Sequence, residues 1–231
     1  MSERSPFVAD FLNKSGLNRQ FVFDLSDLPA DIVDKLAPQA GERQLILFGH
    51  GGRRLWECVK TSGLTGEHPI DDYSIRTIKR WFAEQLPGRR YRLLFPSEQP
   101  IGLQALGKLA GWHHPSPIMV GVDREWGSWY AYRAVVIADT DFVPSVAEEA
   151  RSPCPSCAAQ PCLAACPADA LQGGQFDLDR CSRYRLRPES PCAHGCLARQ
   201  ACPVGSQHRY EDAQIMHSYS RSLAVIRQYY R

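Results

Sequence analysis

Eight of the nine cysteines in this chain fall between residues 154 and 202, and the ninth, Cys58, stands alone far upstream. The first four have two, four and three residues between them and end before Pro167: Cys154, Cys157, Cys162 and Cys166. The second four are spaced more widely and end before Pro203: Cys181, Cys192, Cys196 and Cys202. This concentration indicates that the C-terminal third is a separate module whose fold depends on cysteine chemistry.

The expected compartment decides which cysteine chemistry applies. The N-terminal sequence MSERSPFVADFLNK lacks the apolar core of a secretory signal, and no apolar run approaches the roughly 18 residues of a membrane span. We therefore expect a cytoplasmic protein with no membrane partner. Because a reducing compartment disfavours structural disulfides, the eight clustered thiols are expected to bind metal.

Both cysteine groups end in Cys-Pro, the pattern of bacterial ferredoxins that hold two [4Fe–4S] clusters. In those proteins a compact run supplies three thiolates to one cluster, and the Cys-Pro cysteine ligates the other. The same logic predicts two interleaved ligand sets. The first set is Cys154, Cys157, Cys162 and Cys202. The second set is Cys166, Cys181, Cys192 and Cys196.

Two other interpretations of the cysteines remain open. Close thiolate pairs also suit two tetrahedral zinc sites, although zinc ribbons and knuckles usually present separated pairs rather than a run of four ending in Cys-Pro. Disulfides are the third option. Cys58, in the helix-like segment LWECVK, is interpreted as a small buried hydrophobe, with a functional role as the alternative.

Residues 1–150 are expected to form the main domain, with strands and helices in alternation. QLILFGH (44–50), YRLLFP (91–96), SPIMVGVD (116–123) and WYAYRAVVIADTDF (129–142) read as strands. DDYSIRTIKRWFAEQL (71–86), capped by Asp71 or Asp72, and IGLQALGKLAGW (101–112) read as helices. The pattern predicts an α/β or α+β sandwich with a sheet core, and it leaves parallel and antiparallel order open.

The remaining boundaries follow from the cysteines. Residues 151–209 are expected to form the two-cluster module, and residues 210–231 a closing helix that packs on the main domain. The formal charge is +2, and Lys and Arg are spread along the chain, so no nucleic-acid partner is expected.

The stretch from Gly111-Trp112 through Gly127-Ser128-Trp129 into the cysteine groups and Cys181-Ser182-x-Tyr184 resembles the cobalamin-dependent epoxyqueuosine reductase family, over roughly residues 85–205. In that family, and in the related reductive dehalogenases and cobalamin-processing chaperones, a nitroreductase-like α/β domain binds a corrinoid beside a two-cluster ferredoxin domain. The resemblance implies the same two domains here, with the same ligand sets and a corrinoid in residues 1–150; a flavin is the second option.

The chain departs from the family at two places. Ser97 stands where the family has an acidic proton donor, and Glu98 is only its neighbour. His113 and His114 stand where the family has a lysine after Gly-Trp. These differences argue against epoxyqueuosine reduction as the reaction.

Five residues are the candidates for cofactor binding in the main domain: His50, Gly51, Glu98, Trp129 and Arg133. The glycine turn at 49–52 could present backbone N–H groups to an anion, and its alternative is a polar surface turn. His50 could ligate a metal or corrinoid or simply hydrogen-bond within the turn. The tryptophans could border a planar cofactor or belong to the core.

These features predict a redox protein that passes single electrons through two [4Fe–4S] clusters to a cofactor, most simply a corrinoid, in the N-terminal domain. Its electron donor would be a ferredoxin or flavodoxin. The alternative is a ferredoxin-like carrier or cobalamin-trafficking protein with no catalytic cycle. The sequence leaves open whether the chain is an enzyme.

Overall fold

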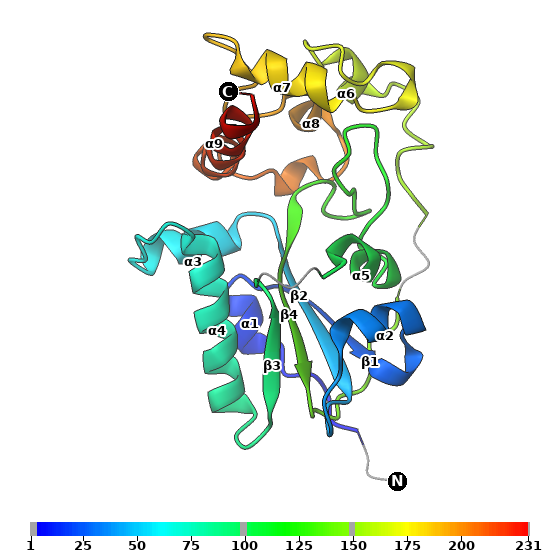
Figure 1. Ribbon diagram of the computed structural model, residues 1–231, viewed down its shortest axis with the longest axis vertical. Coiled ribbons are helices and arrows are strands. Elements are labelled where there is room, and N and C mark those ends of the chain that lie inside the picture. Colours follow the sequence, from blue (N-terminus) through cyan, green and yellow to red (C-terminus); the bar gives the residue numbers. More distant parts are fainter. Residues whose placement is uncertain (1–3, 98–100, 148–150, 231) are drawn as a thin grey trace. The chain divides into compact units, whose positions relative to one another are not determined.

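The chain forms two compact units in a computed structural model that describes residues 4–97, 101–147 and 151–230 (Figure 1). The sheet unit comprises residues 4–97, 101–110 and 130–147, and the cysteine unit comprises residues 111–129 and 151–230. The sequence predicted that the main domain is continuous and ends near residue 150. The chain in fact also leaves the sheet unit at residue 111 and returns to it at residue 130.

A four-stranded antiparallel sheet is the centre of the sheet unit, which settles the strand direction that the sequence left open. Its order is β1 (Arg19–Asp24), β2 (Gln44–Gly51), β4 (Tyr130–Ala138) and β3 (Tyr91–Phe95). The fold class is therefore α+β, as predicted. The predicted strands at 44–50, 91–96 and 129–142 correspond to β2, β3 and β4.

Helices surround this sheet, and a short 3-10 turn at Leu25–Asp27 follows β1. They are α1 (Asp10–Lys14), α2 (Ala30–Leu36), α3 (Arg54–Thr61), α4 (Pro69–Gln85) and α5 (Leu103–Leu109). Ile46 and Phe48 of β2 point to one face, where they form a core with side chains of α1, α3 and α4. Leu45 and Leu47 point to the other face and are equally buried, so β2 is covered on both sides.

Helix α4 confirms the predicted helix at 71–86. Ile78, Trp81 and Phe82 form its buried face, as the helical spacing of apolar residues requires. The predicted cap was wrong, because His68 occupies the N-cap position and Pro69 begins the helix. Asp71 therefore lies in the first turn.

A β-bulge interrupts β4 at Arg133. Phe48 pairs with Ala134 and Gly49 pairs with Tyr132, so Arg133 is the extra residue between two paired positions. A bulge re-aims the side chain that it carries. This irregularity sets the direction of Arg133, one of the five candidate residues.

The cysteine unit is built from three short helices and one long helix, joined by turns. They are α6 (Pro161–Ala164), α7 (Leu178–Leu186), α8 (Leu197–Ala201) and α9 (Asp212–Tyr229), with 3-10 turns at Gln172–Gly174 and Ser206–His208. The sequence predicted that residues 210–231 pack on the main domain. Within the cysteine unit, α9 packs against α7, and its Ile215 joins a small core with Trp129 and Tyr210.

The predicted strand at 116–123 is absent from the structure. This segment forms only isolated bridges, His114 with Val122 and Asp123 with Gly127. Met119 has a left-handed backbone with φ of 58°, which interrupts extended structure. The apolar pattern has another origin, because Ile118 packs within the cysteine unit in a core that includes Leu171 and Ala198.

Candidate functional site

Helix packing brings the two cysteine groups together. Helix α6 carries Cys162 and packs against α8, which begins after its N-cap Cys196 and ends before its C-cap Cys202. The packing of α6 against α8 therefore brings the first cysteine group close to the second. Cys181 lies on α7, one turn before Arg185.

The thiols of the first predicted ligand set influence one another. Burial raises the pKa of Cys154, and the charges of Cys202, Cys162 and Cys157 raise it further. Burial likewise raises the pKa of Cys162, again with contributions from Cys202 and Cys157. Cys202 thus lies among cysteines that are at least 40 positions away in the chain.

The second predicted set shows the same grouping. Burial raises the pKa of Cys181 to about 11, with further upward contributions from Cys196, Cys166 and Cys192. Burial also raises the pKa of Cys192, and Cys196 and Cys166 add to it. The charge of Arg185 opposes both shifts.

A mostly apolar cavity of about 280 Å³ lies where the second set converges. All four of its cysteines line the cavity, together with Leu171 and Arg185. Four thiols around one apolar space are the donor set and surroundings that a [4Fe–4S] cluster requires.

Among residues 4–97, 101–147 and 151–230, no three His, Cys, Asp or Glu side chains are arranged to hold one metal ion.

The raised thiol pKa predicts how the metal-free protein responds to pH. The pKa of Cys181 rises from an ordinary 9.0 to about 11, so between these values the unfolded chain releases this proton first. The free energy of unfolding is then constant below pH 9 with respect to Cys181 and falls as pH rises from about 9 to about 11. Urea denaturation of Cys181→Ser should give a shallower fall over that range, and an identical fall would contradict the assignment.

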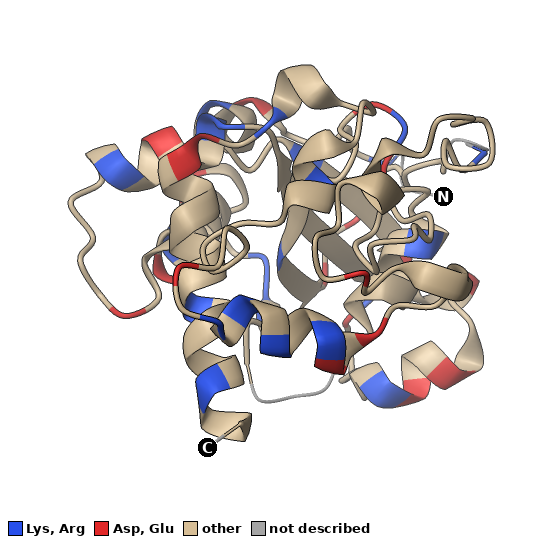
Figure 2. Ribbon diagram, turned by 90° about the horizontal axis from the view of Figure 1, so that it is seen from above, with Lys and Arg blue, Asp and Glu red and all other residues tan. Residues whose placement is uncertain are grey.

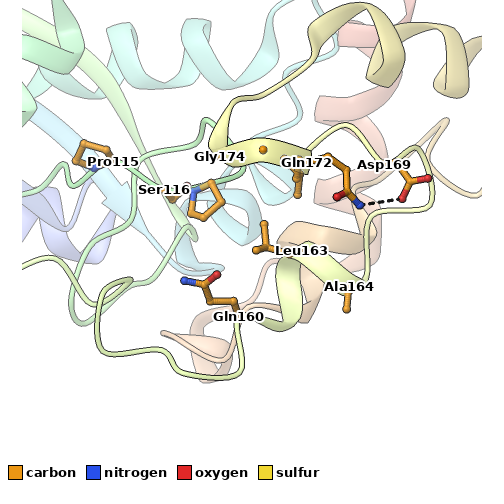
Figure 3. Close-up of a pocket in the computed structure, with 11 residues that line it drawn as sticks. Pro115, Ser116, Gln160, Leu163, Ala164, Asp169, Gln172 and Gly174 are labelled. Atoms are coloured by element: carbon orange, nitrogen blue, oxygen red, sulfur yellow. Dashed lines mark hydrogen bonds between the residues drawn. The ribbon is translucent and has the colours of Figure 1, made fainter.

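A second hollow of about 650 Å³ in the cysteine unit contains none of the eight cysteines (Figure 3). Pro115 and Ser116 of the 111–129 segment border it together with Leu163 of α6. Gln172 closes another side and donates a hydrogen bond to the Asp169 carboxylate at 3.4 Å. Only one charged side chain lines this hollow, so it lacks the donor set for a metal cluster.

In the sheet unit, the bulge at Arg133 joins two of the candidate residues. The Nε of Arg133 donates to Nδ1 of His50 at 3.1 Å, and its Nη1 lies 3.5 Å from the Asp71 carboxylate. A guanidinium can only donate, so Nδ1 of the buried His50 accepts and the proton of the neutral ring lies on Nε2. In this tautomer Nε2 is a hydrogen-bond donor and has no lone pair for a metal.

Gly51 lies at the end of β2 and is buried. Its N–H donates to the Asn18 side chain at 2.8 Å, and its carbonyl accepts from the same side chain at 3.1 Å. Nearby, Arg54 donates to the Lys14 carbonyl and pairs with Glu57. Residues 49–51 are therefore part of the buried strand β2 rather than a surface turn, and the N–H of Gly51 is bonded to Asn18 rather than open to an anion.

The other candidates are distributed differently. Trp129 is fully buried in the cysteine unit, where the Arg199 guanidinium lies 4.5 Å from its ring centre, so it belongs to the core of that unit. Glu98 lies outside the described residues. Ser97 donates to the Leu94 carbonyl at 2.6 Å, and His114 contacts the Val122 carbonyl through Nδ1 at 3.1 Å.

Sequence reasoning missed two residues of these sites. Asp71 was considered only as a helix cap, although it pairs with Arg133. Arg185 was not considered, although its side chain is buried beside the second set. Its i, i+4 spacing from Cys181 was the available signal.

The chain matches no family model, and it matches none of the curated proteins. Solved structures do resemble it. An epoxyqueuosine reductase with a tRNA-Tyr epoxyqueuosine-modified stem loop aligns with a TM-score of 0.54 and 14% identity, over 90% of this chain and 67% of that one. The Bacillus subtilis epoxyqueuosine reductase aligns with a TM-score of 0.52 and 13% identity, over 88% of this chain and 66% of that one.

The fold is therefore that of the epoxyqueuosine reductases, as the sequence motifs predicted. The chain covers about two thirds of the length of each of these structures. No described helix has the length and apolar character to cross a membrane.

Proposed function

We propose that this chain is an iron–sulfur redox protein whose two interleaved cysteine sets each hold a [4Fe–4S] cluster. The observation that carries the proposal is the cavity of about 280 Å³ lined by Cys166, Cys181, Cys192 and Cys196. Cys166 follows α6, while the other three belong to the second group. If each cysteine group held its own cluster, Cys166 of the first group would have no reason to lie among the cysteines of the second group.

Each cluster would supply one-electron transfer, and the chain's own residues would set the conditions for it. Apolar side chains such as Leu171 and Phe176 line the same cavity and limit water access to the sulfurs. A cysteine thiol must lose its proton to bind iron, and the raised pKa of Cys181, about 11, makes this loss less favourable in the metal-free protein.

We further propose that the sheet unit binds the cofactor that receives these electrons, with a corrinoid as the first candidate and a flavin as the second. Support comes from the shared fold and from Arg133, whose side chain contacts His50 and Asp71 beside the bulge in β4.

A corrinoid titration tests this second step. Anaerobically reconstituted protein should shift the absorption spectrum of cob(II)alamin, and reductant should then convert it to cob(I)alamin. Arg133→Met should weaken binding at least about tenfold, since a charge-assisted hydrogen bond contributes roughly 1.5–3 kcal/mol. Arg76→Met, at an exposed position on α4, is the matched control.

An electron carrier without its own reaction is the competing function. Ser97 occupies the position of the family's proton donor, and its hydroxyl donates a hydrogen bond to the Leu94 carbonyl at 2.6 Å. That contact favours a protein that delivers electrons without protonating a substrate. Unchanged spectra for both cobalamins and flavins, with two intact clusters, would establish the carrier and exclude the bound cofactor.

A further inference from the structure

Arg185 is a buried cation whose hydrogen-bond acceptors are all neutral. Its side chain is 7% exposed. Nε donates to the Cys192 carbonyl at 3.1 Å and Nη1 donates to the Ser222 hydroxyl at 3.0 Å. Nη2 donates to the carbonyls of Ala193 and Tyr219 at 3.3 and 2.9 Å. These bonds satisfy the guanidinium without cancelling its charge.

No carboxylate among the residues that the structure describes forms an ion pair with Arg185. A buried charge normally requires a partner of opposite sign, because desolvation costs several kcal/mol. The Tyr219 ring, 5.2 Å from the guanidinium carbon, and the C-terminal end of α7 offset this charge only in part. The remaining positive charge indicates that an anion belongs nearby.

The position of Arg185 identifies that anion. Arg185 lines the same cavity as the four cysteines of the second set. Cys181 lies four residues earlier on α7 and so shares its helix face. The carbonyl bonded by Nε belongs to Cys192, another member of the set.

We propose that Arg185 raises the reduction potential of the cluster held by Cys166, Cys181, Cys192 and Cys196, an inference that rests on the proposed function. The reduced cluster carries one more negative charge than the oxidised cluster. A buried cation beside it stabilises the reduced form more, because water screens the interaction weakly there. Arg185 thereby directs electrons to this cluster.

A purely structural role must be separated from this electrostatic one. Arg185 also connects α7 to the turn at 192–193 and to α9 through Tyr219 and Ser222. Losing that connection would loosen the cysteine unit and release iron. It would not shift the potential of a cluster that stays bound.

The test is a redox titration of each cluster followed by electron paramagnetic resonance. In Arg185→Gln, the reduced-to-oxidised ratio of one cluster at a fixed potential should fall at least tenfold, which is 59 mV for one electron. The other cluster should be unchanged, and Arg185→Lys should stay close to wild type. Equal potentials in the wild type and Arg185→Gln would overturn the inference.

Arg183→Gln is the matched control on the same helix. Arg183 is exposed and pairs with Asp179 at 2.7 Å. Figure 2 marks Lys and Arg in blue and Asp and Glu in red along the ribbon. Solvent and salt screen such a charge, so its removal should leave both potentials unchanged. The Arg185 effect should persist at high salt.

A second pair of variants decides the matter if Arg185→Gln loses iron. Ser222 is exposed, and its hydroxyl lies 3.0 Å from Nη1. Ser222→Asp would neutralise the guanidinium without removing it and should lower the same potential, whereas the neutral isostere Ser222→Asn should not. Identical potentials in the Asp and Asn variants would overturn the inference. A wild-type protein without two clusters would instead overturn the proposed function.

Discussion

Replacing Cys202 with serine is expected to remove about four of about eight irons per chain, because each [4Fe–4S] cluster depends on all four thiolates. The lost cluster should be the one that also depends on Cys154, although 47 residues separate the two cysteines along the chain. The reason is the packing of α6 against α8, whose C-cap is Cys202. The measurement is iron and sulfide content after anaerobic reconstitution.

Double variants show which cluster was lost. Cys202→Ser combined with Cys154→Ser should retain about four irons, the same as either single variant, because both changes affect one cluster. Cys202→Ser combined with Cys192→Ser should retain almost none, because the two changes affect different clusters.

Two sequential sets would reverse these results. If Cys202 served the same cluster as Cys192, the pair with Cys154 would lose all iron and the pair with Cys192 would keep half. Cys58→Ser should leave the iron content unchanged. Cys58 lies in α3, in the other unit, with its thiol 3.7 Å from the Lys14 carbonyl.

Replacing Gly205 with alanine is expected to disrupt the cysteine unit. Gly205 has a φ of 63°, and a Cβ there would overlap the main chain of Trp126 and Gly127. Main-chain atoms cannot turn aside as a flexible side chain can. The combined strain and overlap should cost roughly 2–5 kcal/mol and lower the iron that the protein retains. Urea denaturation measures the loss.

Gly173→Ala is the control for backbone strain alone. Gly173 also has a positive φ, 72°, but an added Cβ would meet nothing within 4 Å. Its cost should be limited to about 1–2 kcal/mol. Equal losses in the two variants would show that the contact between the 111–129 segment and Gly205 does not stabilise the unit.

The sequence predicted the elements whose apolar residues repeat with the period of a helix or run continuously as in a buried strand. The buried stripe of α4 and the continuous apolar run of β2 have periods that only a helix and a covered strand satisfy. The cysteine spacing also predicts two interleaved ligand sets, since ferredoxin geometry links Cys-Pro to the neighbouring cluster, and these sets stay a prediction. The thiol interactions group the cysteines in the same way.

Other features depend on contacts that no local pattern contains. The segment at 116–123 is apolar because Ile118 packs in the cysteine unit, and its pattern resembled a strand for that reason. The direction of the Arg133 side chain depends on a β-bulge that exists only because β4 pairs with β2. The burial of Arg185 depends on α9 and the turn at 192–193, whose carbonyl groups accept its hydrogen bonds.

The most direct test of the account is metal analysis of the anaerobically reconstituted protein, combined with electron paramagnetic resonance of the reduced form. Two clusters predict about eight irons and eight sulfides per chain and signals from two reduced [4Fe–4S] centres. Stoichiometric zinc with no sulfide, which the same eight thiols could also bind as two tetrahedral sites, would contradict it.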